Sequence, residues 1–236
     1  MLLFEGSTNR RELNKLVKDF ETLLTELNEI DGRRSSLAGK LATIDKIESV
    51  TDYSIDLNQA TQQSTILLKQ INHDILEVIA SYEEQEITDP QIKKIFLLLS
   101  LFQKRINLLL KLREKEAKTL AYVVSFLNHL DTPFLRWRYK RKRRKIFYQI
   151  LKERVLITQI MLAYLHDEKT IESIKRMIKQ ENTKETVVKG VAAISFLTPG
   201  IGIILSIMIH ELFKYANQYT ENYKELEAIL RKKRWA

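Results

Sequence analysis

Apolar residues recur every three or four positions through most of this chain, the spacing that one face of an α-helix presents. In the first 30 residues the stripe is broader than a strict coiled-coil seam. Its members there are Leu13, Leu16, Val17, Phe20, Leu23, Leu24, Leu27 and Ile30. Strict two-residue alternation is absent, so we expect no sheet. The pattern predicts an all-α fold, a bundle of long helices.

Prolines mark three helix starts in the back half of the sequence. Pro90, Pro133 and Pro199 each follow Asp or Thr, residue types that cap helices, and proline is well tolerated at the first helical position. With only 6 Gly and 3 Pro, the chain has few turn residues, which favours long elements. We therefore expect a helix to begin at each of the three prolines.

The front half offers weaker boundary signals. Ser7 or Thr8 is expected to cap the first helix, and the dipeptide Asp31-Gly32 predicts a turn that ends it. A second apolar stripe follows at 37–47. A third helix is expected after Tyr53.

One apolar segment, Gly190 to Ile209, contains 20 residues without a formal charge. A straight helix of that length reaches about 30 Å, the thickness of the hydrocarbon layer of a bilayer. Thr198-Pro199-Gly200 breaks it into two halves. Three alternatives stay open: a kinked single span, a re-entrant or interfacial hairpin, and a helical hairpin buried in a soluble bundle. The residues expected to insert are Val191, Ile194, Phe196, Leu197, Pro199, Gly200, Gly202, Ile204, Leu205 and Ile209.

Charge divides the chain, whose net charge is +9. Residues 1–90 have a balance of −8, and residues 91–236 a balance of +17. A strongly basic half indicates an anionic partner.

Composition and helix signals together suggest four parts. These are an acidic helical lobe (1–89), a basic lobe with an apolar core (90–186), the membrane-competent segment (187–215) and a basic helical tail (216–236). Long antiparallel helices shared by both lobes are an equally good division.

Two clusters combine basic and aromatic residues, and both tryptophans of the chain lie in them. Such mixtures suit the headgroup layer of anionic membranes, and also nucleic-acid backbones with stacked bases. A solvated or internally neutralised helix face is the third alternative. The clusters are Arg136, Trp137, Arg138, Tyr139, Lys140, Arg141, Lys142, Arg143, Arg144 and Lys145, then Arg231, Lys232, Lys233, Arg234 and Trp235.

Catalytic patterns are lacking. The chain has no cysteine, so thiol chemistry and cysteine-ligated zinc are excluded. His210-Glu211 begins like a zinc-protease motif, but Lys214 stands where the second histidine is required. Gly200 and Gly202 form no phosphate loop, because neither a third glycine nor a lysine follows. We expect no enzyme, metal, cofactor or small-molecule substrate.

A bundle of long helices with an apolar stretch that contains Gly and Pro, here Val187 to Ile209, resembles the helical pore-forming toxins of the cytolysin A kind. The resemblance implies a soluble form that hides the segment and a membrane form that inserts it.

The leading hypothesis is a non-enzymatic, membrane-associated helical protein, an anchor, scaffold or pore component, with the bulk of the chain in the cytoplasm. An anionic membrane surface is the expected partner, and homo-oligomers are possible. The N-terminus lacks the features of a signal peptide. The alternative is a soluble bundle, free in the cytoplasm, that binds nucleic acid or an acidic protein through Arg136–Lys145.

Overall fold

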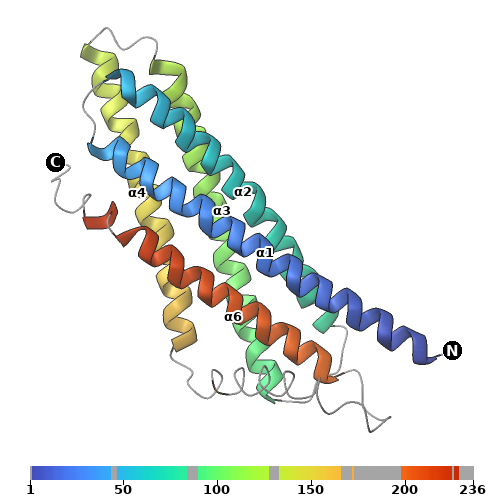
Figure 1. The fold of residues 1–236 in the computed structure, drawn as a ribbon. Helices are drawn as coiled ribbons and strands as arrows, with labels where there is room; N and C mark the ends of the chain where they lie inside the picture. The colour runs from blue at the N-terminus through green and yellow to red at the C-terminus, as the bar shows by residue number, and fades with distance from the viewer. Residues whose placement is uncertain are drawn as a thin grey trace.

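The computed structural model describes residues 2–43, 47–83, 90–127, 133–165, 172, 198–224 and 226–228. Within these ranges the chain forms long helices and no strand, which confirms the all-α prediction. The helices are α1 (Leu2–Thr43), α2 (Ile47–Glu83), α3 (Pro90–Leu127), α4 (Pro133–Leu165) and α6 (Thr198–Asn222) (Figure 1).

Helix starts follow the proline signals closely. α3 begins at Pro90 and α4 at Pro133, and α6 begins at Thr198, one residue before Pro199. The missing amide hydrogen of proline costs nothing in a first turn, where that group has no partner inside the helix. These three predictions are confirmed.

The predicted boundaries in the front half are wrong. α1 begins at Leu2, before the expected cap at Ser7 or Thr8, and α2 begins at Ile47 rather than after Tyr53. No turn occurs at Asp31-Gly32, because α1 continues to Thr43. Asp31 is fully buried there, and its ion pairs with two arginines outweigh the local turn preference of the dipeptide.

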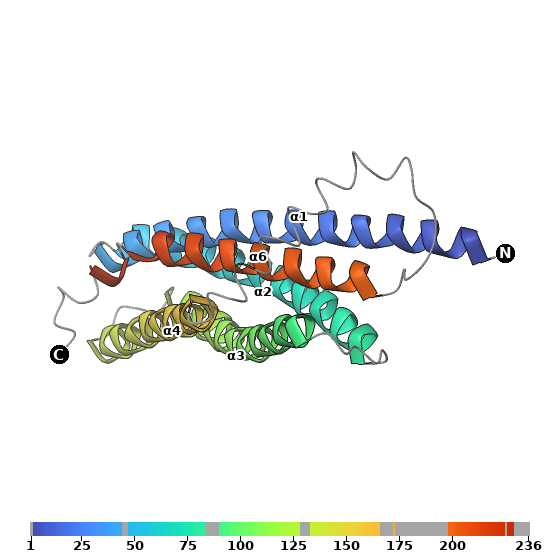
Figure 2. The same cartoon turned by 90° about the horizontal axis from the view of Figure 1, so that it is seen from below.

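The described helices pack as one bundle. α1 packs against α2 and α6, and α3 packs against α2, α4 and α6. Figure 2 shows α1 beside α6 in one layer and α3 beside α4 in the other. α3 and α4 run in opposite directions (Figure 1).

Buried positions follow a spacing of alternating three and four residues. In α3 this spacing joins Ile92, Ile95, Leu99, Phe102, Ile106, Leu109, Arg113, Glu116, Leu120 and Val123, and Leu110 and Thr119 are buried beside them. This is the heptad spacing of coiled coils, in which one narrow seam faces the neighbouring helices. All the described helices contribute to a single apolar core. The same spacing also places charged residues inside the bundle.

Candidate functional site

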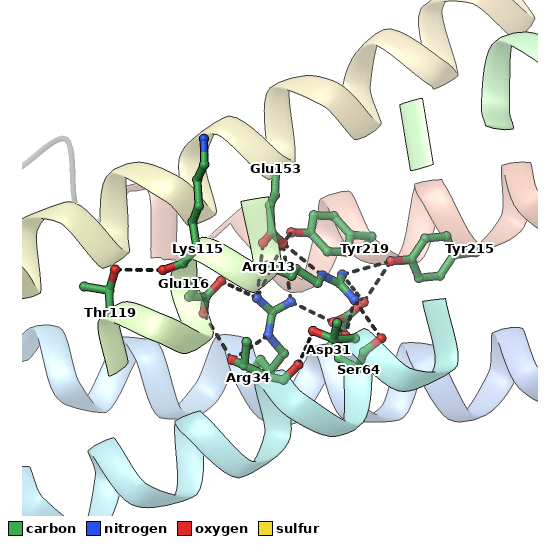
Figure 3. Close-up of polar contacts among 12 residues, drawn as sticks. Asp31, Arg34, Ser64, Arg113, Lys115, Glu116, Thr119, Glu153, Tyr215 and Tyr219 are labelled. Atoms are coloured by element: carbon green, nitrogen blue, oxygen red, sulfur yellow. Dashed lines mark hydrogen bonds and ion pairs between the residues drawn. The ribbon is translucent and has the colours of Figure 1, made fainter. Parts of the chain in front are cut away.

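A layer of charged and polar side chains crosses the middle of the bundle (Figure 3). Each of its residues is at most 4% exposed, and every described helix supplies at least one of them. The layer consists of Asp31 and Arg34 from α1, Thr61 and Ser64 from α2, Arg113 and Glu116 from α3, Glu153 from α4, and Tyr215 and Tyr219 from α6.

Arg34 is the first of two guanidinium groups in this layer. It donates to Asp31 Oδ1 at 2.9 Å, to Glu116 Oε2 at 2.7 Å and to Glu153 Oε2 at 3.4 Å. Its Nε lies 3.3 Å from the hydroxyl of Thr61. Arg34 therefore joins α1 to α2, α3 and α4, and the planar fork of arginine makes such multiple donation possible.

Arg113 is the second guanidinium. It donates to Asp31 Oδ2 at 2.9 Å and to Glu153 Oε2 at 3.3 Å, and also to Ser64 Oγ. Burial raises the pKa of Asp31, but the charges of Arg113 and Arg34 outweigh burial and hold that pKa below its usual value. Asp31 is therefore ionised, and both guanidinium groups pair with it.

Two tyrosines of α6 close the layer. The Tyr215 hydroxyl donates to Asp31 Oδ2 at 2.8 Å, and the Tyr219 hydroxyl donates to Glu153 Oε2 at 2.8 Å. Burial raises the pKa of both phenols well above the usual value, and the neighbouring carboxylates add to that rise. Both phenols keep their protons and fasten α6 to α1 and α4.

Replacing Tyr219 by phenylalanine is expected to lower the free energy of unfolding by about 1–3 kcal/mol, because the buried Glu153 carboxyl group loses a donor. Tyr223 provides a matched control: it is equally buried, and its hydroxyl has no hydrogen-bond partner among the described residues. Urea unfolding should show Tyr223→Phe to be neutral or slightly stabilising. Equal losses in the two variants would show that ring packing, rather than the hydroxyl, holds α6.

The layer contains three carboxyl groups and only two guanidinium groups. Burial raises the pKa of Glu116 to about 8, although the charge of Arg34 opposes the rise. The negative charge of Glu153, and a hydrogen bond between the two carboxyl groups, raise it further. Glu116 therefore retains a proton at neutral pH.

Among the described residues, the space beside these groups is small. A cavity next to the layer has a volume of about 10 Å³, close to that of one water molecule, and apolar side chains from several helices line it. The part of the chain that the structure describes has no group of His, Asp and Glu residues able to hold a metal ion. The layer joins all the described helices, an arrangement that fixes helix register.

Sequence reasoning assigned no functional role to any residue of the layer, and it placed Asp31 in a turn. A signal was present, because Asp31 and Arg34 continue the three-four spacing of the apolar stripe formed by Phe20, Leu24 and Leu27. Charged residues at core positions of a heptad pattern are rare, because each must be paired. Their regular placement predicts a buried polar layer.

The first basic-aromatic cluster lies in the first turns of α4. Most of its residues are exposed: Arg136, Trp137, Arg138, Lys140, Arg141, Arg144 and Lys145. Tyr139, Lys142 and Arg143 are half-buried, and Arg143 donates to the carbonyl oxygen of Leu41. The second cluster, Arg231–Trp235, lies outside the described residues.

Exposed apolar side chains continue the same face of α4. Trp137, Tyr148, Val155 and Leu162 are 50–60% exposed, and intervals of 7 and 11 residues return to one face of a helix. From Trp137 to Leu162 this face is about 38 Å long. Nothing in the sequence alone distinguished these exposed positions from core positions. We call this surface, from Trp137 to Leu162, the α4 face.

Two of the residues expected to insert into a membrane are placed in the core. Leu205 and Ile209 are fully buried in the bundle. Pro199, Gly200, Gly202 and Ile204 belong to the first turns of α6. Val191, Ile194, Phe196 and Leu197 lie outside the described residues. No helix within the described ranges combines the length and apolarity needed to cross a bilayer, so a transmembrane helix is not supported there.

Comparison with models of protein families, with curated proteins and with solved structures gave no match.

Proposed function

We propose that this protein is a non-enzymatic helical scaffold that binds the surface of an anionic phospholipid membrane through the α4 face. Cations and apolar groups occur together on that face. Arg141 lies 5.8 Å from the ring centre of Trp137, and Lys152 lies 4.8 Å from that of Tyr148. Rings and alkyl groups suit the boundary between headgroups and acyl chains, and the cations suit lipid phosphates.

The aliphatic members of the α4 face favour lipid over nucleic acid. Val155 is 56% exposed and Leu162 is 50% exposed, and neither can stack on a base or contact a phosphate. An interfacial helix buries such groups at the acyl boundary. Electrostatic attraction would bring the basic half of the chain to the surface, and the apolar groups would then hold it there.

Binding to phosphatidylcholine vesicles with and without phosphatidylserine tests this proposal. Trp137→Ser combined with Leu162→Ser is expected to weaken binding to the anionic vesicles at least tenfold, because two apolar side chains no longer leave water. The matched control is Ile66→Ser combined with Leu76→Ser, two exposed apolar residues of α2 that should not matter. Equal losses in the two pairs, or tighter binding of wild type to single-stranded RNA than to vesicles, would overturn the proposal.

Tryptophan fluorescence gives an independent readout, because the chain has only two tryptophans. With Trp235→Phe, the remaining emission comes from Trp137, and it should shift to shorter wavelength on anionic vesicles. Added salt should reverse the shift, since it screens the electrostatic attraction. An unchanged emission maximum would show that Trp137 stays in water.

A further inference from the structure

α3 carries a row of lysines on its outward side. Lys104, Lys111, Lys115 and Lys118 are all exposed, and their spacing places them on one face of the helix. The row is about 21 Å long. The acidic residues of α3 are Glu114 and Glu116. Glu116 is buried in the polar layer, and Glu114 pairs with Lys69 of α2 at 3.3 Å.

The register of the two antiparallel helices sets these lysines level with the apolar part of the α4 face along the bundle. Arg113 Nε lies 3.3 Å from Glu153 Oε2. Residues of α3 and α4 whose numbers sum to about 266 therefore lie at the same height along the bundle. Lys118 is therefore level with Tyr148, and Lys111 with Val155. The dense basic cluster of α4 ends at residue 145, just before this apolar part begins. The lysines of α3 thus supply charge where α4 has little.

A direct contact joins the two surfaces. Tyr122 follows Lys118 by one turn on α3, and Lys142 of α4 lies over its ring with Nζ 4.3 Å from the ring centre. The Arg138 guanidinium lies 5.7 Å from the same ring centre. The basic cluster of α4 is therefore continuous with the outward face of α3 rather than separated from it by a neutral strip.

We infer that the lysine row of α3 is a second half of the docking surface, so that the protein lies with α3 and α4 together against anionic lipid headgroups. This inference rests on the proposed function. α1 lies in the opposite layer of the bundle and faces away from the membrane in this orientation (Figure 2). The occupant of the surface is phospholipid, since the complementary charge and the neighbouring exposed Leu97 and Leu108 fit headgroups above acyl chains.

The test replaces Lys104, Lys111 and Lys118 by glutamine in the full chain and measures binding to phosphatidylcholine–phosphatidylserine vesicles. Binding is expected to weaken at least tenfold, because each lysine near an anionic surface contributes several-fold. The matched control replaces Lys15, Lys18 and Arg33, three exposed basic residues of α1, by glutamine. Its net charge changes equally, so its binding should weaken no more than twofold.

Two outcomes separate this inference from the proposed function. If the α3 and α1 variants weaken binding equally while the α4 double variant still loses at least tenfold, the inferred orientation is wrong and the proposed function stands. If the α4 double variant, Trp137→Ser with Leu162→Ser, binds like wild type, the inference and the proposed function are both wrong. Circular dichroism of each variant excludes unfolding, and none of the substituted residues is buried.

Discussion

Replacing Arg113 by methionine is expected to destabilise the folded protein by about 3–5 kcal/mol, the usual result of removing one partner from a buried ion pair. The variant removes one of the two cations, Arg113 and Arg34, that pair with Asp31 and Glu153 in a region that water does not reach. Methionine fills a similar volume, so the loss reflects charge rather than a void. Urea unfolding followed by circular dichroism measures it.

Two further variants make this expectation specific. Lys111→Met, on the exposed side of the same helix, should change the free energy of unfolding by less than about 1 kcal/mol. Arg113→Lys keeps the charge but loses the planar fork that reaches two carboxylates, so an intermediate loss is expected. If Arg113→Met were as stable as Lys111→Met, the buried layer would not constrain the fold.

Local sequence signals predicted part of the helix architecture. The starts at Pro90, Pro133 and Pro199 could be predicted because proline acts on the residues beside it, whatever the rest of the chain does. The dipeptide Asp31-Gly32 misled because its turn preference is small beside the contacts that Asp31 makes with residues more than 80 positions away. Such contacts leave no trace in a short window of sequence.

The two candidate sites also differ in how much of each could be predicted from the sequence. The basic cluster of α4 was visible because its residues are consecutive in the sequence. The packing of the described helices decides that Val155 and Leu162 share the exposed side of this cluster. It also decides that the lysines of α3 lie level with them. The buried layer required one more step, the recognition that charges at heptad core positions in separate helices must meet.

The pH dependence of stability should be governed by Glu116. Its pKa is about 8 in the folded protein and 4.5 when unperturbed, so the unfolded chain releases this proton first as the pH rises. The stability that Glu116 contributes is fully present below its pKa in the unfolded chain. It is lost progressively as the pH rises to its pKa in the folded protein. Asp31 acts oppositely: its lowered pKa gives stability that is lost only as the pH falls below 3.8. The two effects together place maximum stability in mildly acidic solution.

Wild type is therefore expected to be more stable at pH 5 than at pH 8, with a decline of roughly 1 kcal/mol per pH unit between them. Glu116→Gln mimics the protonated carboxyl group, so its free energy of unfolding should stay nearly constant over this range and exceed that of wild type at pH 8. Glu114→Gln, at an exposed site on the same helix, should keep the wild-type slope. Urea unfolding at intervals between these pH values measures all three. A wild-type profile that is flat, or that rises with pH, would show that Glu116 is ionised in the folded protein.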